Sequence, residues 1–365
     1  MRFDEQAGCW EVFSYADVEQ LTADTQRFSR DYLAGTTGLP WHPALDAMWA
    51  ADPPRHTQLR QLAATPFSPA TLRGLEDDIR AIAAELLPQR LATDATIDVL
   101  GFARSYSNRV ICRMLDLPLE DDERIAGWVE EQIRAPSVFE LPRQTAMIRY
   151  FSEFLRERRR NPRNGLVDSL LAAQDSGYEV AGKPMTLQTV LGYLWTLLVA
   201  GSETTPTSLG NALIAFIAGG HLEALRELRR RDDVRGTDRA IAEALRWNPA
   251  FPAVTVIANE KVAIGGALID AGSWVKGWIS AANRDPLKFA DPQVFDIGRE
   301  PNRHLSFSVG PHHCLGAPLA RLEIRVAVET ILDAVPQPVE LDQESLRYSL
   351  GLVNSLCSAT FRLSG

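Results

Sequence analysis

Apolar residues recur at helical spacing through most of the first two thirds of the chain. Between Asp52 and about residue 250, long amphipathic stretches alternate with short breaks rich in proline, glycine or charge, which is the pattern of helices joined by tight connections. The stretches expected to be helical are 69–91, 97–115, 120–134, 142–160, 164–174, 186–218 and 237–247. The pattern therefore predicts a mainly α protein.

The alternation of apolar and polar residues that marks a strand is confined to short segments near the two ends. These segments are 10–15, 255–258, 262–265, 274–278 and a pair within 350–361. A further helix is expected to begin at Tyr15. Residues 29–51 contain several glycines and prolines and predict an irregular loop that covers another part of the molecule. The expected architecture is thus mainly α with small β-sheets.

Composition narrows the classes of partner. The chain has 38 basic and 47 acidic residues and a net charge of −9, which argues against binding to nucleic acid or to an anionic membrane. The four cysteines form no CxxC pair, so neither a zinc ribbon nor a dense disulfide framework is indicated. The longest apolar run, 190–201, is too short to span a membrane. We therefore expect a cytoplasmic protein, and a monomer.

Cys314 lies at the end of a loop that is expected to lead directly into a helix. Gly310 and Gly316 allow tight turns around it, and Pro318 suits a first helical turn. A sulfur beside the free N–H groups of a helix start accepts hydrogen bonds and feels the positive end of the dipole, which lowers the pKa and favours thiolate. Thiolate is the form that binds iron, and thiolate ligation of haem promotes O–O cleavage.

Two other interpretations of Cys314 follow from the residues alone. An isolated cysteine is most often a small core residue. Zinc binding together with His312 and His313 is the second, but adjacent loop residues rarely present ligands tetrahedrally, and no partner pair stands at zinc-finger spacing.

The segment around Cys314 resembles the haem-binding loop of the cytochrome P450 family. The shared pattern is Phe307, Gly310 four residues before the cysteine, and Gly316 two residues after it. The resemblance implies haem b with Cys314 as its axial thiolate, and haem contacts from the other three residues. Ser308 departs from the pattern, because the family usually carries a second glycine there.

The resemblance extends from about Trp10 to the C-terminus, with several motifs in family order. It implies a single-domain cytochrome P450 fold over 1–365, a triangular helix-rich prism around a buried haem. A helix-rich region would cover about 52–250 and a mixed region with the haem loop about 251–365. Family members usually carry additional residues before the position of Trp10, so the N-terminal part is expected to be shorter than usual.

An acid and a hydroxyl interrupt the apolar face of the expected helix 186–218, at Glu203 and Thr204. Hydrogen bonding of the threonine to the preceding turn is the simple interpretation. The P450 family carries the same pair after Ala-Gly, here Ala200 and Gly201. The resemblance implies that Glu203 and Thr204 supply protons for dioxygen activation and that the two small residues line the haem.

Pro206 follows this pair within the same helix. Because proline has no N–H, the carbonyl of Ser202 is left without its helical partner. A local distortion of the helix, opening a groove for dioxygen and water, is expected at this point.

Glu243 and Arg246 stand three residues apart, on one face of an expected helix. Most such pairs are solvated surface contacts. The family has a Glu-x-x-Arg helix whose pair is completed by an arginine upstream of the cysteine loop, and Arg299 occupies that place. The implied role is a structural charge network on the haem side of the core.

His56 and Arg60 are one helical turn apart, and such a pair of donors suits carboxylates. An exposed helix start with incidental charge is the alternative. The family uses these positions, together with the histidine at His312, to bind the haem propionates. A further propionate-binding arginine of the family would fall at Val256, where this chain has none.

The resemblance implies that the substrate is bound by apolar and aromatic side chains from several segments, although plain core packing is the alternative for about half of them. The residues expected to contact substrate are Trp41, Trp49, Trp195, Val199, Phe251, Val254, Leu352 and Val353. A medium-sized hydrophobic or aromatic molecule would fit such a lining.

The expected activity is that of a monooxygenase which hydroxylates this molecule with O2, and the expected setting is secondary metabolism. The sequence contains no flavin or iron–sulfur motif, so electrons from NAD(P)H are expected through a ferredoxin and a ferredoxin reductase. Basic residues on the cysteine side form a candidate docking patch, unless they are simply scattered over the surface. They are Arg60, Arg73, His313, Arg321 and Arg325.

Two rival functions remain open from the sequence. The same fold and haem could catalyse coupling, desaturation, cyclisation or peroxygenation. The protein could also be a non-enzymatic haem sensor or carrier. The Glu203–Thr204 pair favours dioxygen activation over the first of these, and turnover of a substrate would distinguish an enzyme from the second.

Overall fold

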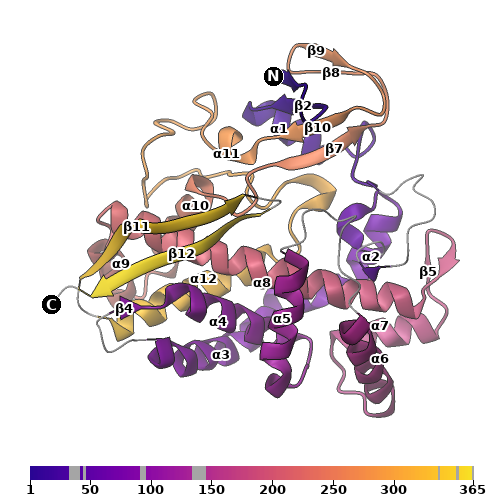
Figure 1. Cartoon of the computed structure of the whole chain (residues 1–365), viewed down its shortest axis with the longest axis horizontal. Helices are drawn as coiled ribbons and strands as arrows, with labels where there is room; N and C mark the ends of the chain where they lie inside the picture. Colours follow the sequence, from indigo (N-terminus) through magenta and orange to yellow (C-terminus); the bar gives the residue numbers. More distant parts are fainter. Residues whose placement is uncertain are drawn as a thin grey trace.

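The computed structural model describes residues 1–32, 42–43, 47–90, 96–133, 145–335, 338–350 and 353–363. Helices form most of it, and a sheet with its own small helices lies at one end (Figure 1). The α-helices are α1 Tyr15–Ala23, α2 Arg55–Ala64, α3 Pro69–Leu86, α4 Val99–Met114, α5 Asp122–Ile133, α6 Thr145–Arg160, α7 Leu166–Asp175, α8 Leu187–Ala218, α9 Leu222–Arg230, α10 Val234–Trp247, α11 Ile279–Ala282 and α12 Ala317–Ala334.

The strands are short except for a hairpin near the C-terminus. They are β1 Arg2–Asp4, β2 Cys9–Val12, β3 Phe28–Ser29, β4 Thr96–Ile97, β5 Glu179–Val180, β6 Lys183–Pro184, β7 Val254–Ala258, β8 Val262–Ile264, β9 Ala267–Ile269, β10 Trp274–Gly277, β11 Val339–Leu350 and β12 Asn354–Leu363. The largest sheet has the order β1-β2-β10-β7-β3, and β11-β12-β4 form a second sheet.

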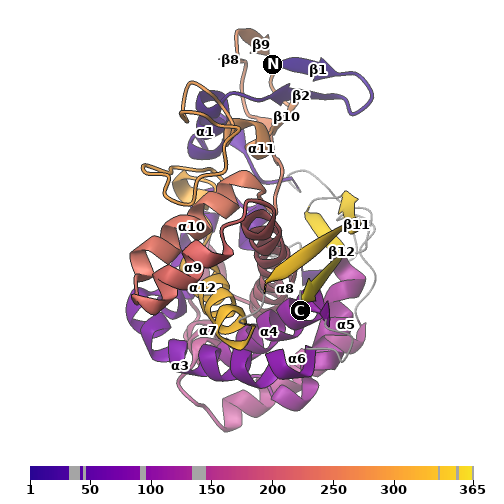
Figure 2. The ribbon, with the colours of Figure 1, turned by 90° about the vertical axis from the view of Figure 1, so that its left-hand side faces the viewer.

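The long helix α8 runs through the middle of the helical part (Figure 2). Thr186 caps its start, because its side chain accepts a hydrogen bond from the N–H of Thr189 at 3.3 Å. Almost every residue of α8 from Thr189 to Leu198 and from Thr205 to Leu213 is buried. A helix that is apolar all round in this way belongs inside a protein.

Two hydrophobic cores result from this arrangement. The larger one joins α3, α4, α8, α10 and α12, and the smaller one joins α1 to β2, β7 and β10. The segment that leads to Cys314 connects them: Leu305 is buried in the smaller core, whereas Phe307 and Leu315 pack against the larger one. Cys314 is therefore held at the junction of the two cores.

The elements expected from the sequence are largely present, with differences at their ends. The expected helix 97–115 begins at Val99, because Asp98 caps it by accepting from the N–H of Gly101 and residues 96–97 pair as β4. The expected pair of strands within 350–361 is wrong in extent, since β11 begins at Val339. Within the described residues, no single helix is both long and apolar enough to cross a membrane; α8 and α9 meet that test only together, and they are bent by 108°.

Candidate active site

The loop before α12 fixes the position of Cys314 through its backbone. The N–H of Cys314 donates to the carbonyl of Phe307 at 2.8 Å, and the N–H of His313 donates to Gly310 at 3.0 Å. The carbonyl of Cys314 accepts from the N–H of Ala317 at 3.3 Å, in the first turn of α12. The cysteine thus stands directly at the start of the helix.

Gly310 is required by this loop for two reasons. Its φ is +70°, and a Cβ placed on it would come within 2.7 Å of the Cα of Ala23 in α1. Any side chain would therefore displace backbone rather than a flexible group. Ser308, where the family usually has glycine, also adopts a left-handed backbone, with φ of 59°.

The thiol of Cys314 is accessible, although many protein atoms surround it. Burial raises its pKa, while hydrogen bonds from the backbone N–H groups of Gly316 and Ala317 and the charges of Arg60 and Arg321 act in the opposite direction. An accessible sulfur in a densely packed region lies on the wall of an interior space. The N–H groups and arginine charges around this sulfur are those that stabilise a thiolate.

A short stretch in the middle of α8 is accessible although the helix is buried on either side. Ala200 is exposed, and Val199, Gly201 and Thr204 are partly exposed, whereas Glu203 is 9% exposed. In a helix that the rest of the fold surrounds, such a stretch faces an interior space rather than the outer surface.

The hydroxyl of Thr204 donates to the carbonyl of Ala200 at 2.8 Å. The helix is assigned as α-helix without interruption from Leu187 to Ala218, with Pro206 inside it. The local distortion expected at Pro206 therefore does not interrupt the helix. Hydrogen bonding of a threonine to the preceding turn satisfies the hydroxyl without a break in the ladder.

Two histidines expected to bind propionates are in contact. The ring centroids of His56 on α2 and His312 in the cysteine loop lie 4.0 Å apart. The Nδ1 atom of His56 and the Nε2 atom of His312 are buried and have no hydrogen-bond partner among the described residues. Such atoms are costly unless a ligand or water completes them.

Electrostatics around the histidines are dominated by positive charge. Burial, together with the charges of Arg60 and Arg30, lowers the pKa of His56 to about 4. Burial lowers the pKa of His312 to about 2, with contributions from Arg30, His56 and Arg60. A carboxylate-bearing group would hydrogen-bond to the unpaired nitrogens and would also balance the excess of positive charge. The residues present therefore fit the carboxylates of a haem.

Glu243, Arg246 and Arg299 form one buried network. Arg246 and Glu243 are both fully buried, and their side chains are joined by two hydrogen bonds of 2.7 and 2.8 Å. Arg299 donates to the same carboxylate at 3.1 Å. Arg246 also donates to the carbonyls of Asn283 and Pro292. The network ties α10 to the segment that precedes the cysteine loop.

The expected substrate contacts are placed unevenly. Trp195 is 5% exposed and its ring meets His42, so it adds little accessible surface. Trp49 packs on Tyr32, whose hydroxyl donates to Thr255 in β7 at 2.6 Å. Four others are partly exposed, namely Val199, Phe251, Val254 and Val353. Trp41 and Leu352 lie outside the described residues.

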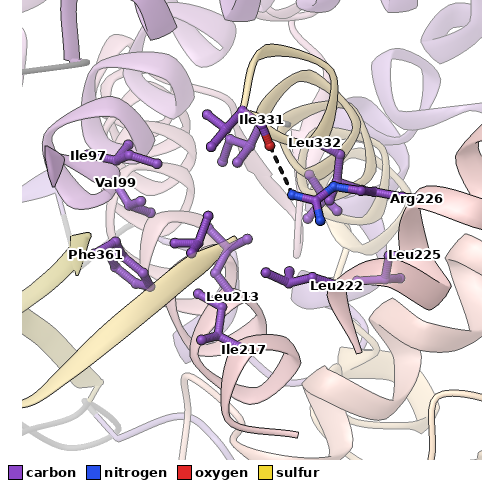
Figure 3. Close-up of a pocket in the computed structure, with 13 residues that line it drawn as sticks. Ile97, Val99, Leu213, Ile217, Leu222, Leu225, Arg226, Ile331, Leu332 and Phe361 are labelled. Atoms are coloured by element: carbon purple, nitrogen blue, oxygen red, sulfur yellow. Dashed lines mark hydrogen bonds between the residues drawn. The ribbon is translucent and has the colours of Figure 1, made fainter. Parts of the chain in front are cut away.

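An apolar pocket elsewhere in the fold is a packing feature (Figure 3). It is lined by Leu213 and Ile217 of α8 together with side chains from α9, α12, β4 and β12, and Arg226 donates to the carbonyl of Val335 at 3.0 Å. Leu213 and Ile217 follow Thr204 by roughly two to four helical turns. This pocket is therefore separate from the space beside Thr204.

A buried acid was not anticipated from the sequence. Glu323 on α12 is 4% exposed, and burial raises its pKa to about 8. Ser107 on α4 hydrogen-bonds to Glu323 and also donates to the carbonyl of Gly201 at 3.0 Å. Glu323 thus connects to α8 beside the Ala200–Thr204 stretch. In the sequence, the buried position of Glu323 was indicated only by the apolar residues around it in α12.

The raised pKa of Glu323 makes stability depend on pH. The folded state holds a proton at this site that the unfolded chain releases at its ordinary pKa of about 4.5, so the contribution to stability is present below that value and is lost as pH rises toward about 8. We expect the urea midpoint of Glu323→Gln, measured relative to that of wild type, to be higher at pH 8 than at pH 6. Equal differences at both pH values would contradict this.

Comparison with known proteins agrees with this geometry. The family model described as Cytochrome P450 matches residues 143–336. Cytochrome P450 109 of Bacillus spizizenii is 33% identical over 344 residues, which cover 91% of this chain and 80% of that protein. The mycinamicin IV hydroxylase/epoxidase of Micromonospora griseorubida is 33% identical over 356 residues, covering 94% and 86%.

Comparison with solved structures agrees with the comparison of sequences. The crystal structure of the post-tailoring hydroxylase HmtN, involved in himastatin biosynthesis, superposes with a TM-score of 0.85 at 30% identity and covers 100% of this chain and 93% of that one. The chain therefore belongs to the cytochrome P450 family. It is a monooxygenase that acts on a small molecule and uses haem with cysteine ligation, which confirms the fold and the class of activity expected from the sequence.

Proposed function

We propose that Cys314 is the axial thiolate ligand of the haem and that the enzyme hydroxylates a medium-sized hydrophobic or aromatic molecule. The observation that carries the proposal is the accessible Cys314 thiol at the start of α12, with the N–H groups of Gly316 and Ala317 directed at it. The described residues contain no cluster of three or more His, Cys, Asp or Glu that could hold a metal ion. A single sulfur suits haem iron, whose remaining ligands come largely from the porphyrin.

The surrounding residues hold the cofactor in place. His56, Arg60 and His312 would bind its propionates, and the loop from Phe307 to Gly316 would cover its cysteine side, with Gly310 fixing the loop against α1. Ala200, with only a methyl group, and Gly201, with no side chain, would leave room for the cofactor beside α8. The haem, when bound, supplies the redox chemistry by which dioxygen is activated, and thiolate ligation favours O–O cleavage.

Glu203 and Thr204 would control protons on the α8 side. The Thr204 hydroxyl holds its proton toward Ala200 and lies on the accessible stretch of the helix. Rotation of that side chain would direct the proton into the interior space, and Glu203, at the preceding position, would supply a replacement proton. The chain's contribution to the reaction is thus proton supply, orientation and exclusion of bulk water.

The substrate class rests on the residues expected to contact the substrate. Val199, Phe251, Val254 and Val353 are partly exposed and apolar, which favours a hydrophobic molecule held by few polar contacts. The relatives named above include a mycinamicin IV hydroxylase/epoxidase and a hydroxylase of himastatin biosynthesis. A role in secondary metabolism is consistent with both.

Electrons from NAD(P)H would arrive through a ferredoxin and a ferredoxin reductase. The basic residues of the candidate docking patch are only partly available in the structure. Arg325 is paired with Glu76 at 3.6 Å and Asp238 at 3.7 Å, and Arg60 acts on the interior thiol. Arg73 is exposed, and Arg321 lies over the ring of Phe307 at 4.7 Å. The docking surface is therefore smaller than the sequence suggested.

The proposed reaction is tested with the holoenzyme. Hydrophobic compounds are screened by the haem spin-state shift, and a compound that binds is turned over with ferredoxin, its reductase and isotopically labelled dioxygen. We expect one labelled oxygen atom in the product. Turnover to an unlabelled product would indicate coupling, desaturation or cyclisation instead, and binding without turnover would indicate a sensor.

A further inference from the structure

Arg30 lies beside the proposed propionate site although no motif in the sequence singles it out. It follows β3, whose Ser29 pairs with Ile257 of β7, so that the chain continues past Val256. The N–H of Arg30 donates to Asp52 at 2.9 Å, and the hydroxyl of Ser29 donates to the same carboxylate. The backbone at Arg30 is thereby fixed to the residues that lead into α2.

The guanidinium of Arg30 reaches the cysteine loop. Its Nη2 atom donates to the hydroxyl of Ser308 at 3.3 Å. It is also among the charges that act most strongly on both His56 and His312. One end of the side chain is therefore anchored at β3 and the other lies among the groups that face the haem.

This guanidinium has no ion pair with a carboxylate among the described residues. Asp52 attracts its charge, but the hydrogen bonds to that carboxylate come from the backbone N–H of Arg30 and the hydroxyl of Ser29. Desolvation lowers the pKa of Arg30, as it does for an interior cation. A cation in such surroundings is costly unless an anion completes it. The neighbouring nitrogens of His56 and His312 are also without partners. A negatively charged group would therefore satisfy the guanidinium of Arg30 and the unpaired nitrogens of both histidines.

Val256 explains why a cation is needed from this direction. The residue at that position is fully buried in the smaller core, where it packs beside β10 and the helix α1. It offers no donor to the haem. Arg30, one strand away in the same sheet, brings a guanidinium to the same side of the site.

We infer that Arg30 binds a propionate carboxylate of the haem, and that the hydroxyl of Ser308 positions its guanidinium. The inference rests on the proposed haem site at Cys314. Arg30 is a cofactor-binding residue that compensates for the absence of an arginine at Val256. The non-glycine residue at Ser308 then has a use, because glycine would offer Arg30 no acceptor.

The test measures how firmly the haem is held. Haem transfer from the ferric holoenzyme to excess apomyoglobin is followed for wild type, Arg30→Ala and Arg30→Lys. We expect roughly tenfold faster transfer from Arg30→Ala, since a hydrogen bond between charged groups is lost, and an intermediate rate from Arg30→Lys. Arg27→Ala is the matched control: Arg27 lies three residues earlier, pairs with Asp24 and is half-exposed, and its loss leaves the rate unchanged.

A second cofactor separates binding from a purely structural role. Each protein is reconstituted with the dimethyl ester of iron protoporphyrin, which has no propionate charge. If Arg30 binds a propionate, the rates of wild type and Arg30→Ala become nearly equal with the ester. A persistent difference with the ester, or equal rates with ordinary haem, would overturn the inference.

The two proposals fail in different ways. If wild-type protein lacked the spectrum of thiolate-ligated haem, the proposed site at Cys314 would be wrong. If wild type and Arg30→Ala both showed that spectrum and released haem at the same rate, the site would stand and the role of Arg30 would be wrong.

Discussion

Replacement of Cys314 by serine is expected to abolish the far-shifted Soret band that reduced protein shows with carbon monoxide, and to reduce turnover below detection. A hydroxyl is a much weaker donor to iron than thiolate, and the electron donation that promotes O–O cleavage is lost with the sulfur. The fold is expected to persist, because the thiol is accessible and its protein contacts are backbone N–H groups that a serine oxygen can also accept. The measurement is the carbon monoxide difference spectrum of the purified variant.

Cys357→Ser provides the control for this experiment. Cys357 is also exposed, but it lies on β12 and its sulfur donates to the carbonyl of Ser355 at 3.5 Å. This variant should keep the wild-type spectrum. A shifted band that survived in Cys314→Ser would show that another group binds the iron.

The helical architecture could be predicted because it depends on local patterns. The apolar run in 186–218 and the capping threonine before it specify α8 almost to the residue. The strand ends could not be predicted in the same way. β11 extends back to Val339 through pairing with β12, and pairing between segments is decided by tertiary contacts that a single segment does not encode.

The same distinction between local patterns and tertiary contacts applies to the residues of the site. Cys314, Thr204 and His56 stand in recognisable local motifs, and the structure places each beside an accessible interior surface or an unsatisfied polar atom. Arg30 and Glu323 had no such motif. Arg30 reaches the site by the pairing of β3 with β7, and Glu323 is connected through Ser107 on another helix. Their roles depend on contacts distant in sequence.

The second large effect is expected at Arg246, whose replacement by methionine should destabilise the protein by about 3–5 kcal/mol. Methionine retains apolar bulk but leaves Glu243 fully buried without its closest cation. Burial opposes ionisation of that acid, yet the hydrogen bonds from Arg246, from the N–H of Asp296 and from Arg299 hold its pKa below the ordinary value. The measurement is the free energy of unfolding in urea, together with the fraction of haem retained.

A double variant and a variant of an exposed ion pair test the cause of this loss of stability. If an uncompensated carboxylate causes the loss, Arg246→Met combined with Glu243→Gln should be less destabilising than the sum of the two single variants. Arg239 on the same helix pairs with Glu300 at 3.2 Å in solvent, and Arg239→Ala should cost less than about 1 kcal/mol. Additive effects of the two buried substitutions would mean that Arg246 acts through its bonds to the carbonyls of Asn283 and Pro292, which hold the segment before the cysteine loop, rather than through charge.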